Sequence, residues 1–346
     1  MSRLIHIGLL AAILASCTIG SLPPRRLSQL TERAITALGQ YALPQWSPDG
    51  RYIAFISDTN RLRNLTVYDT ETTMIWPVAS EVDQGHYSWT PENRLSYLKF
   101  RPELSGTPCP AISDLHTVDV NGQNDHVAVS NLYGPDSYIW FKDRHELVAL
   151  LQTSSARCDY HDIYSIDVST GRIQQLISRQ ELGIKYPVAL ALSPNESLLA
   201  IYGFRESAFA SGGSEDSEMV LFIFSLGSKS VIREIVPNRD STLLRVEADS
   251  LQANLSGEHL AWAQGEEWIF DKANAPSGEC YNYSLFFLNV INVSKSFCIP
   301  TAEGIITEPA LSIDLKHVTF ILSQGPNEEY IMIADFTDEY RSRLEK

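Results

Sequence analysis

The sequence predicts an all-β protein: a six-bladed β-propeller of four-stranded antiparallel blades, with the ring closed by an N-terminal strand. Three observations lead to this fold class. A motif of polar turn and apolar strand recurs six times, its strands are apolar on both faces, and the last repeat is one strand short. Repeats of roughly 40 to 60 residues, each with several short strands, are typical of propeller blades.

The first repeat is the clearest, in the segment WSPDGRYIAF that begins at Trp46. Its Pro-Asp-Gly sequence favours a tight turn, because Pro presets φ, Asp bonds to the backbone ahead and Gly accepts positive φ. Residues 51–57 then form an apolar run without alternation, which indicates a strand covered on both faces. Blades stacked around an axis provide that environment, and we expect Trp46 to pack between two of them.

Five further segments repeat this order of apolar residue, polar turn and apolar strand. They are residues 87–98, 139–150, 192–201, 255–262 and 311–320. Another strand and turn follow, as in residues 64–69 before 70–72, and then a last strand such as 172–177. Each unit is therefore expected to be a four-stranded meander.

The ring closure is predicted from the two ends of the chain. The last unit supplies three strands up to residue 335, and only the charged segment 336–346 follows them. Residues 26–31, RLSQLT, resemble the fourth strand 172–177, RIQQLI, and stand just before the first unit. We expect residues 26–31 to pair with the last unit, which leaves no open edge. The alternative for this segment is a short helix from Ser28 to Leu38 that ends at Gly39.

The N-terminus has the pattern of an export signal. A short basic start is followed by the apolar residues 4–14 and then by Leu-Ala-Ser-Cys, with the cysteine at position 17. The apolar run is too short for a permanent membrane-spanning helix. It resembles a bacterial lipoprotein signal, which implies cleavage before Cys17, lipidation of that cysteine and anchoring to the cell membrane or outer membrane. The alternative is an ordinary cleaved signal with a cysteine there by chance.

The expected organisation follows from these boundaries. Residues 1–16 form the signal peptide, 17–24 an anchor linker, 25–340 the propeller, and 341–346 a charged tail. The protein would then face the periplasm or the exterior.

The repeats resemble those of TolB-type β-propellers. The resemblance rests on WSPDGRYIAF, on NLTVYDTET after it and on SQLT before it, and it weakens along the chain. It implies a binding platform in the cell envelope, with another envelope protein as partner, or a peptide or glycan. The insertions 204–219 and 265–280 are candidate binding loops, or loops that have simply drifted in length.

The charge argues against nucleic acid as a partner. The formal net charge is −15, the isoelectric point is about 4.9, and no run rich in Lys or Arg occurs. A phosphate-binding surface requires clustered basic residues.

Four cysteines remain after Cys17 and are candidates for disulfides in an oxidising compartment. Cys109 and Cys158 precede the third strands of consecutive units, while Cys280 and Cys298 flank a hairpin expected to turn near Asn292. Other pairings stay open, since four cysteines allow three. Cys158 and His161 have the spacing of metal ligands, but no further Cys/His pair stands nearby, so no metal or cofactor is expected.

No catalytic residue is assigned. The chain lacks a G-x-S-x-G elbow, a glycine-rich phosphate loop and an H-E-x-x-H motif. Residues 212–216, GGSED, lack the last glycine of the elbow. The alternative to a binding platform is a hydrolase or lyase whose carboxylates converge in the central channel.

Overall fold

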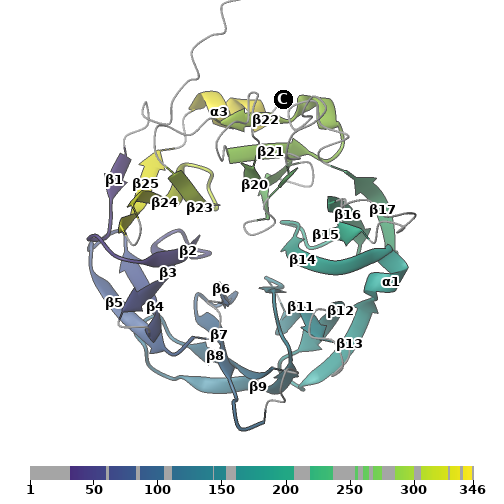
Figure 1. Ribbon diagram of the computed structural model, residues 1–346, viewed down its shortest axis with the longest axis horizontal. Coiled ribbons are helices and arrows are strands. Elements are labelled where there is room, and N and C mark those ends of the chain that lie inside the picture. Colours follow the sequence, from purple (N-terminus) through teal and green to yellow (C-terminus); the bar gives the residue numbers. More distant parts are fainter. Residues whose placement is uncertain are drawn as a thin grey trace, which may run out of the picture.

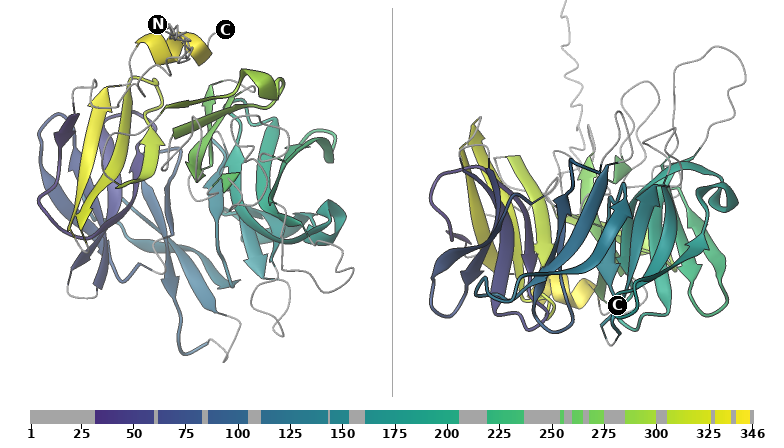
Figure 2. Two further views of the ribbon diagram at one scale, coloured as in Figure 1. Left: turned by 45° about the horizontal axis from the view of Figure 1, so that its top comes forward. Right: turned by 90° about the horizontal axis from the view of Figure 1, so that it is seen from below.

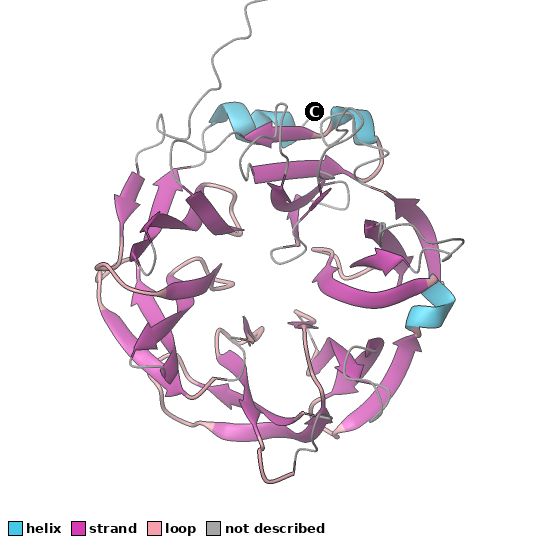
Figure 3. Cartoon of the chain, viewed as in Figure 1, coloured by secondary structure: helices cyan, strands magenta, loops and turns pink. Residues whose placement is uncertain are grey.

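The structure is a computed structural model. It describes residues 32–59, 62–82, 86–104, 111–142, 144–152, 161–205, 219–236, 254–255, 260–264, 268–274, 285–299, 305–325, 328–335 and 338–344. These residues form six antiparallel sheets arranged as blades around a ring (Figure 1), and nearly all regular structure is strand (Figure 3). The predicted fold class, a six-bladed β-propeller, is confirmed.

The first three blades follow the chain without interruption. Blade 1 contains β2 (Tyr41–Trp46), β3 (Tyr52–Thr59), β4 (Leu62–Asp69) and β5 (Ile75–Ser80); blade 2 contains β6 (Tyr87–Trp89), β7 (Leu95–Phe100), β8 (Ile112–Val118) and β9 (His126–Tyr133); blade 3 contains β10 (Tyr138–Trp140), β11 (Glu146–Gln152), β12 (His161–Asp167) and β13 (Arg172–Ile177). Within each blade the strands run from the channel outwards in chain order (Figure 1).

Blades 4 and 5 also run outwards in chain order, and blade 6 does so for three strands before an N-terminal strand forms its outer edge. Blade 4 follows the short helix α1 (Arg179–Leu182) and contains β14 (Ile184–Leu192), β15 (Leu198–Arg205), β16 (Met219–Ser225) and β17 (Ser230–Ile235); blade 5 contains β18 (Asn254–Leu255), β19 (Ala261–Gln264), β20 (Trp268–Asn274), β21 (Leu285–Asn289) and β22 (Phe297–Ile299); blade 6 contains β23 (Ile305–Leu311), β24 (His317–Gly325), β25 (Glu328–Asp335) and β1 (Glu32–Ala34). In blade 5, both β18 and β19 pair with β20. Its hairpin turns through the 3-10 helix η2 (Val293–Lys295), which Asn292 caps, as expected.

The hydrophobic core lies between the blades, which stand side by side around the ring (Figure 2). Each of six clusters of buried residues combines side chains of two neighbouring blades. In β3, Ile53 and Phe55 pack towards blade 6, whereas Ala54 and Ile56 pack towards blade 2. Because successive side chains of a strand point to opposite faces, a strand with a blade on each side is apolar throughout.

The predicted tight turns join the first and second strands of a blade. In blade 1, the Ser47 hydroxyl donates to Asp49 at 2.5 Å, and the Tyr52 N–H donates to Ser47 Oγ at 2.8 Å. Gly50 has a φ of 74°, which glycine adopts without steric cost. Equivalent bonds hold the turns 193–197 and 312–316. We call the side of the ring that carries these three turns the turn face.

An N-terminal strand closes the ring, as predicted. β1 pairs antiparallel with β25, with Arg33 opposite Ile333. The contact continues beyond β1, where the Ile35 N–H donates to the Ile331 carbonyl at 2.8 Å and the Gly39 N–H to the Glu329 carbonyl at 3.1 Å. Residues 26–31, which were expected to make this strand, lie outside the described residues. The alternative helix over 28–38 is wrong for residues 32–34, because these pair as a strand.

The segment after β25 is the helix α3 (Asp338–Leu344). Leu344 is buried with Trp268 of blade 5 and Phe320 of blade 6, so the start of the expected charged tail packs on the propeller. Among the residues that the structure describes, no helix is long and apolar enough to cross a membrane.

Candidate functional site

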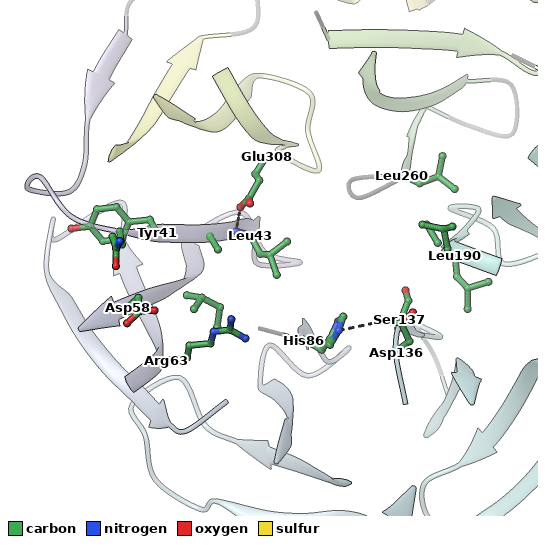
Figure 4. A pocket seen from close by; sticks show the side chains of 15 residues that line it. Tyr41, Leu43, Asp58, Arg63, His86, Asp136, Ser137, Leu190, Leu260 and Glu308 are labelled. Atoms are coloured by element: carbon green, nitrogen blue, oxygen red, sulfur yellow. Dashed lines mark hydrogen bonds and ion pairs between the residues drawn. The ribbon is translucent and has the colours of Figure 1, made fainter. Parts of the chain in front are cut away.

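A cavity of about 640 Å³ lies on the axis of the ring, at the side where the innermost strands begin (Figure 4). We call this side, which is opposite the turn face, the cavity face. All six blades contribute to the lining. Most of the lining residues lie on the first strand of their blade or just before it, and Leu260 stands directly before β19. Blade 1 also contributes Ile56 and Asp58 from β3 and Arg63 from β4.

The repeat explains which residues reach the axis. Five of the lining residues occupy the same position of the repeat. Each stands three residues before the last residue of the first strand of its blade. They are Leu43, His86, Ser137, Ala189 and Glu308. Equivalent positions of radially arranged repeats meet around one axis, so this position defines the channel mouth.

Two of these residues lie in strand irregularities. Leu43 and Glu308 have φ values of 54° and 52°, and each precedes a proline. The pairing register shifts around both residues, between Ala42 and Gln45 and between Thr307 and Ala310. The Glu308 carboxylate accepts a hydrogen bond from the Leu43 N–H, so the two irregular strands of blades 6 and 1 are joined at the cavity. Such conformations cost about 1 to 3 kcal/mol each and persist where the surrounding structure fixes them.

Tyr87 fixes the irregular backbone around Leu43. Its hydroxyl donates to the Ala54 carbonyl at 2.7 Å and also contacts the Leu43 carbonyl. Burial raises the pKa of Tyr87 well above its ordinary value, and the nearby Glu308 raises it further. Tyr87 therefore stays protonated and acts as a positioning residue for the irregular strand.

One wall of the cavity is polar. His86 Nε2 lies 3.4 Å from Asp136 Oδ1, which links blades 2 and 3. Asp58 and Arg63 are opposite each other on β3 and β4, and both are exposed. Figure 4 shows the Arg63 guanidinium pointing into the channel towards His86.

The facing wall is apolar. It consists of Val188, Ala189 and Leu190 on β14 together with Leu260. Leu190 and Leu260 are largely buried, at 6% and 8% exposure. A concave site with an apolar wall and a few convergent polar groups is the usual form of a ligand-binding pocket.

The described residues contain no group of three or more His, Cys, Asp and Glu side chains arranged to hold a metal ion. Within the cavity, one carboxylate oxygen of Glu308 accepts from the Leu43 N–H, and Asp136 pairs with His86.

Trp46, expected to pack between blades, does so. It packs against the cluster between blades 6 and 1 and stacks on His317, with ring centroids 5.8 Å apart. Trp89 and Trp262 also bridge blades, because their indole N–H groups donate to the carbonyls of Gln45 and Ala191 in the preceding blade.

The other residues singled out from the sequence are only partly described. Cys17, Cys109, Cys158 and Cys280 lie outside the described residues, as do most of the two long insertions. Cys298 lies on β22 and packs, partly buried, against the cluster between blades 4 and 5. The disulfide pairings remain predictions.

His161, the other half of the possible metal pair, is described. Its Nε2 donates a hydrogen bond to the Gly134 carbonyl at 3.0 Å, so this nitrogen is engaged with the backbone.

The cavity residues were not predicted from the sequence. The sequence does contain a signal for five of them, because aligning the repeats on their turns brings these five residues to the same position of the repeat. Asp58, Arg63 and Leu260 have no such signal, since they belong to other parts of the repeat.

No protein-family model and no curated protein sequence matches the chain. Solved structures with the same fold include an oligogalacturonate lyase from Vibrio parahaemolyticus, with a TM-score of 0.55, 12% identity, and coverage of 90% of this chain and 95% of that one. A gluconolactonase from Xanthomonas campestris has a TM-score of 0.55 at 11% identity, covering 90% and 91%. TolB from Acinetobacter baumannii has a TM-score of 0.51 at 14% identity, covering 86% of this chain and 63% of TolB. At these identities the similarity shows the propeller fold alone.

Proposed function

We propose that this protein is a lipid-anchored β-propeller of the cell envelope that binds another protein through the cavity on the ring axis. The observation that carries the proposal is the cavity itself, a concave site of about 640 Å³ with one polar and one apolar wall. Pockets of this size and composition are typical binding sites. The TolB-like repeats and fold support a role in the envelope.

The test is photo-cross-linking in intact cells of the native host. A photoreactive residue replaces Val188, which lines the cavity, and in a matched control it replaces Ile313 on the turn face, which is 60% exposed. We expect one envelope protein to be captured from position 188 and not from position 313. Capture of the same proteins from both positions, or of none from position 188, would contradict the proposal.

The lipid anchor at Cys17 is tested separately. We expect the natural protein to incorporate labelled fatty acid and to sediment with membranes, because several acyl chains hold a protein firmly. The Cys17→Ser variant should lose the label and the membrane association. A natural protein that carries no fatty acid would show that the signal is an ordinary one.

A propeller enzyme is the second candidate. The His86–Asp136 pair faces the cavity that Glu308 also lines, and such groups serve as general acids and bases. The fold is similar to those of an oligogalacturonate lyase and a gluconolactonase. Assays with oligogalacturonate and with gluconolactone separate the two candidates: a binding protein gives no turnover, whereas turnover that disappears in His86→Gln would establish the enzyme.

A further inference from the structure

The geometry of the cavity points to a ligand that carries a carboxylate next to an apolar group. We propose that Arg63 binds the carboxylate and that Leu190 and Leu260 receive the apolar group. This assignment rests on the proposed binding function of the cavity and adds the chemical class of its ligand.

Arg63 differs from several other arginines of the chain in its contacts. Several other arginines of the chain are ion-paired, including Arg51 with Asp69, Arg94 with Asp119, and Arg101 with Asp114. In the described part of the chain, the Arg63 side chain forms no ion pair and no hydrogen bond, although the chain carries a net charge of −15. Its guanidinium instead points into the channel (Figure 4).

None of the nearby carboxylates that the structure describes pairs with Arg63. The Glu308 carboxylate is bonded to the Leu43 N–H, and the Asp136 carboxylate lies beside His86. Asp58 stands opposite Arg63 across the strand pair without forming an ion pair with it, and Figure 4 shows the guanidinium reaching towards His86. A guanidinium matches a carboxylate because two of its N–H groups donate in parallel to the two oxygens.

The wall opposite Arg63 indicates the chemistry of the second part of the ligand, its apolar group. Leu190 and Leu260 face the channel from blades 4 and 5, across the axis from Arg63 in blade 1 (Figure 4). A ligand that reaches both walls presents its charge at one end and an apolar group at the other. The C-terminal residue of a partner protein, with an apolar side chain and a free α-carboxylate, has this chemistry, and so does a small carboxylic acid.

The experiment measures binding to the full mature protein in detergent by titration calorimetry. The probes are the peptide Ala-Ala-Leu-Leu with a free C-terminal carboxylate, the same peptide as its C-terminal amide, and N-acetylleucine as a small acid. We expect the free acid to bind at least about tenfold more tightly than the amide, as charged hydrogen bonds require. Tighter binding of the peptide acid than of N-acetylleucine would indicate a chain end, and the reverse a small acid.

Two variants assign the effect to Arg63. Arg63→Gln should bring the affinity for the acid down to that for the amide, and Arg63→Lys should keep part of the difference. The control Arg144→Gln removes an exposed arginine beyond the cavity, near the turn face, and should change nothing. Equal binding of acid and amide, an unchanged preference in Arg63→Gln, or no binding of any probe would overturn the assignment.

The outcomes also separate this assignment from the proposed function. Capture of a partner from position 188 together with equal binding of acid and amide would retain the binding function and reject the carboxylate. Failure of the cross-linking together with Arg63-dependent binding of N-acetylleucine alone would retain the carboxylate and reject a protein partner.

Discussion

Asp314 shows how one side chain holds a repeat together. In the blade 6 turn it accepts hydrogen bonds from the Ser312 hydroxyl at 2.7 Å and from the Lys316 N–H at 3.0 Å. Burial raises the pKa of Asp314, but these hydrogen bonds and the Lys316 ammonium, 3.0 Å from the carboxylate, outweigh it and lower the pKa to about 2. Asn195 takes the same place in blade 4, so an amide oxygen also serves in this turn.

This shift predicts a specific acid sensitivity at Asp314. The folded pKa lies below the ordinary value of 3.8, so the stabilisation is present above that value and is lost as the pH falls through about 2. Asp314→Asn keeps the acceptor and removes the charge. At neutral pH we expect the variant to be less stable by about 1 kcal/mol, because solvent screens this half-exposed group.

Thermal unfolding between pH 2 and 7 checks this expectation. The difference between the natural protein and Asp314→Asn should shrink to near zero at the acid end. A difference that stays constant across this range would show that the charge of Asp314 contributes nothing.

The tryptophans give a second prediction at the residue scale. The Trp89 indole donates to the Gln45 carbonyl at 3.2 Å, whereas the buried Trp46 Nε1 has no partner in the part of the chain that the structure describes. Trp89→Phe loses a hydrogen bond, while Trp46→Phe relieves an unsatisfied N–H. We expect Trp89→Phe to cost about 1 kcal/mol more stability than Trp46→Phe in urea unfolding, and equal costs would contradict this account.

At the scale of elements, the strand that closes the ring was predicted from the sequence and is present in the structure. The missing fourth strand of the last unit predicted an N-terminal partner, and β1 is that partner. Its position is fixed by long-range contacts, such as the Ile35 bond to Ile331 and the Thr36 hydroxyl that accepts from the Ile331 N–H. Local similarity between two segments indicates a strand but carries no information on the register of its pairing.

Ile35 allows a test of the closure. It is 9% exposed and packs with Phe55 of blade 1 and Ile333 of blade 6. Ile35→Ala should destabilise the protein by about 2 kcal/mol or more, because it leaves a gap where the ring closes. The control Ile313→Ala, at a 60% exposed position, should change stability by less than about 0.5 kcal/mol. Similar losses in both variants, measured by denaturant unfolding, would argue against a structural role for the closure.

At the scale of the whole molecule, the placement of the core between blades links every blade to its two neighbours. The cluster between blades 1 and 2 contains Ala54 and Tyr97, and the cluster between blades 6 and 1 contains Ile53 and Ile321. A blade that unfolds exposes two of these clusters at once. The ring is therefore expected to unfold as one unit.

Cooperativity can be measured with two probes. Tryptophan fluorescence and far-ultraviolet circular dichroism should give coincident urea transitions, and Ile35→Ala should shift both to lower urea by the same amount. Separate transitions would indicate that part of the ring unfolds independently.

The sequence by itself determined the repeating unit, its strands and turns, and the number of blades. These follow from local rules: a Pro-Asp-Gly turn after Trp46, and strands apolar on both faces such as residues 51–57. Only the tertiary structure decided which residues meet at the axis, how Glu308 bonds to Leu43, and that Arg63 faces Leu190 and Leu260 across one cavity. Those contacts join blades far apart in the chain, and their geometry depends on strand register, irregular backbone and ring closure, which local patterns do not encode.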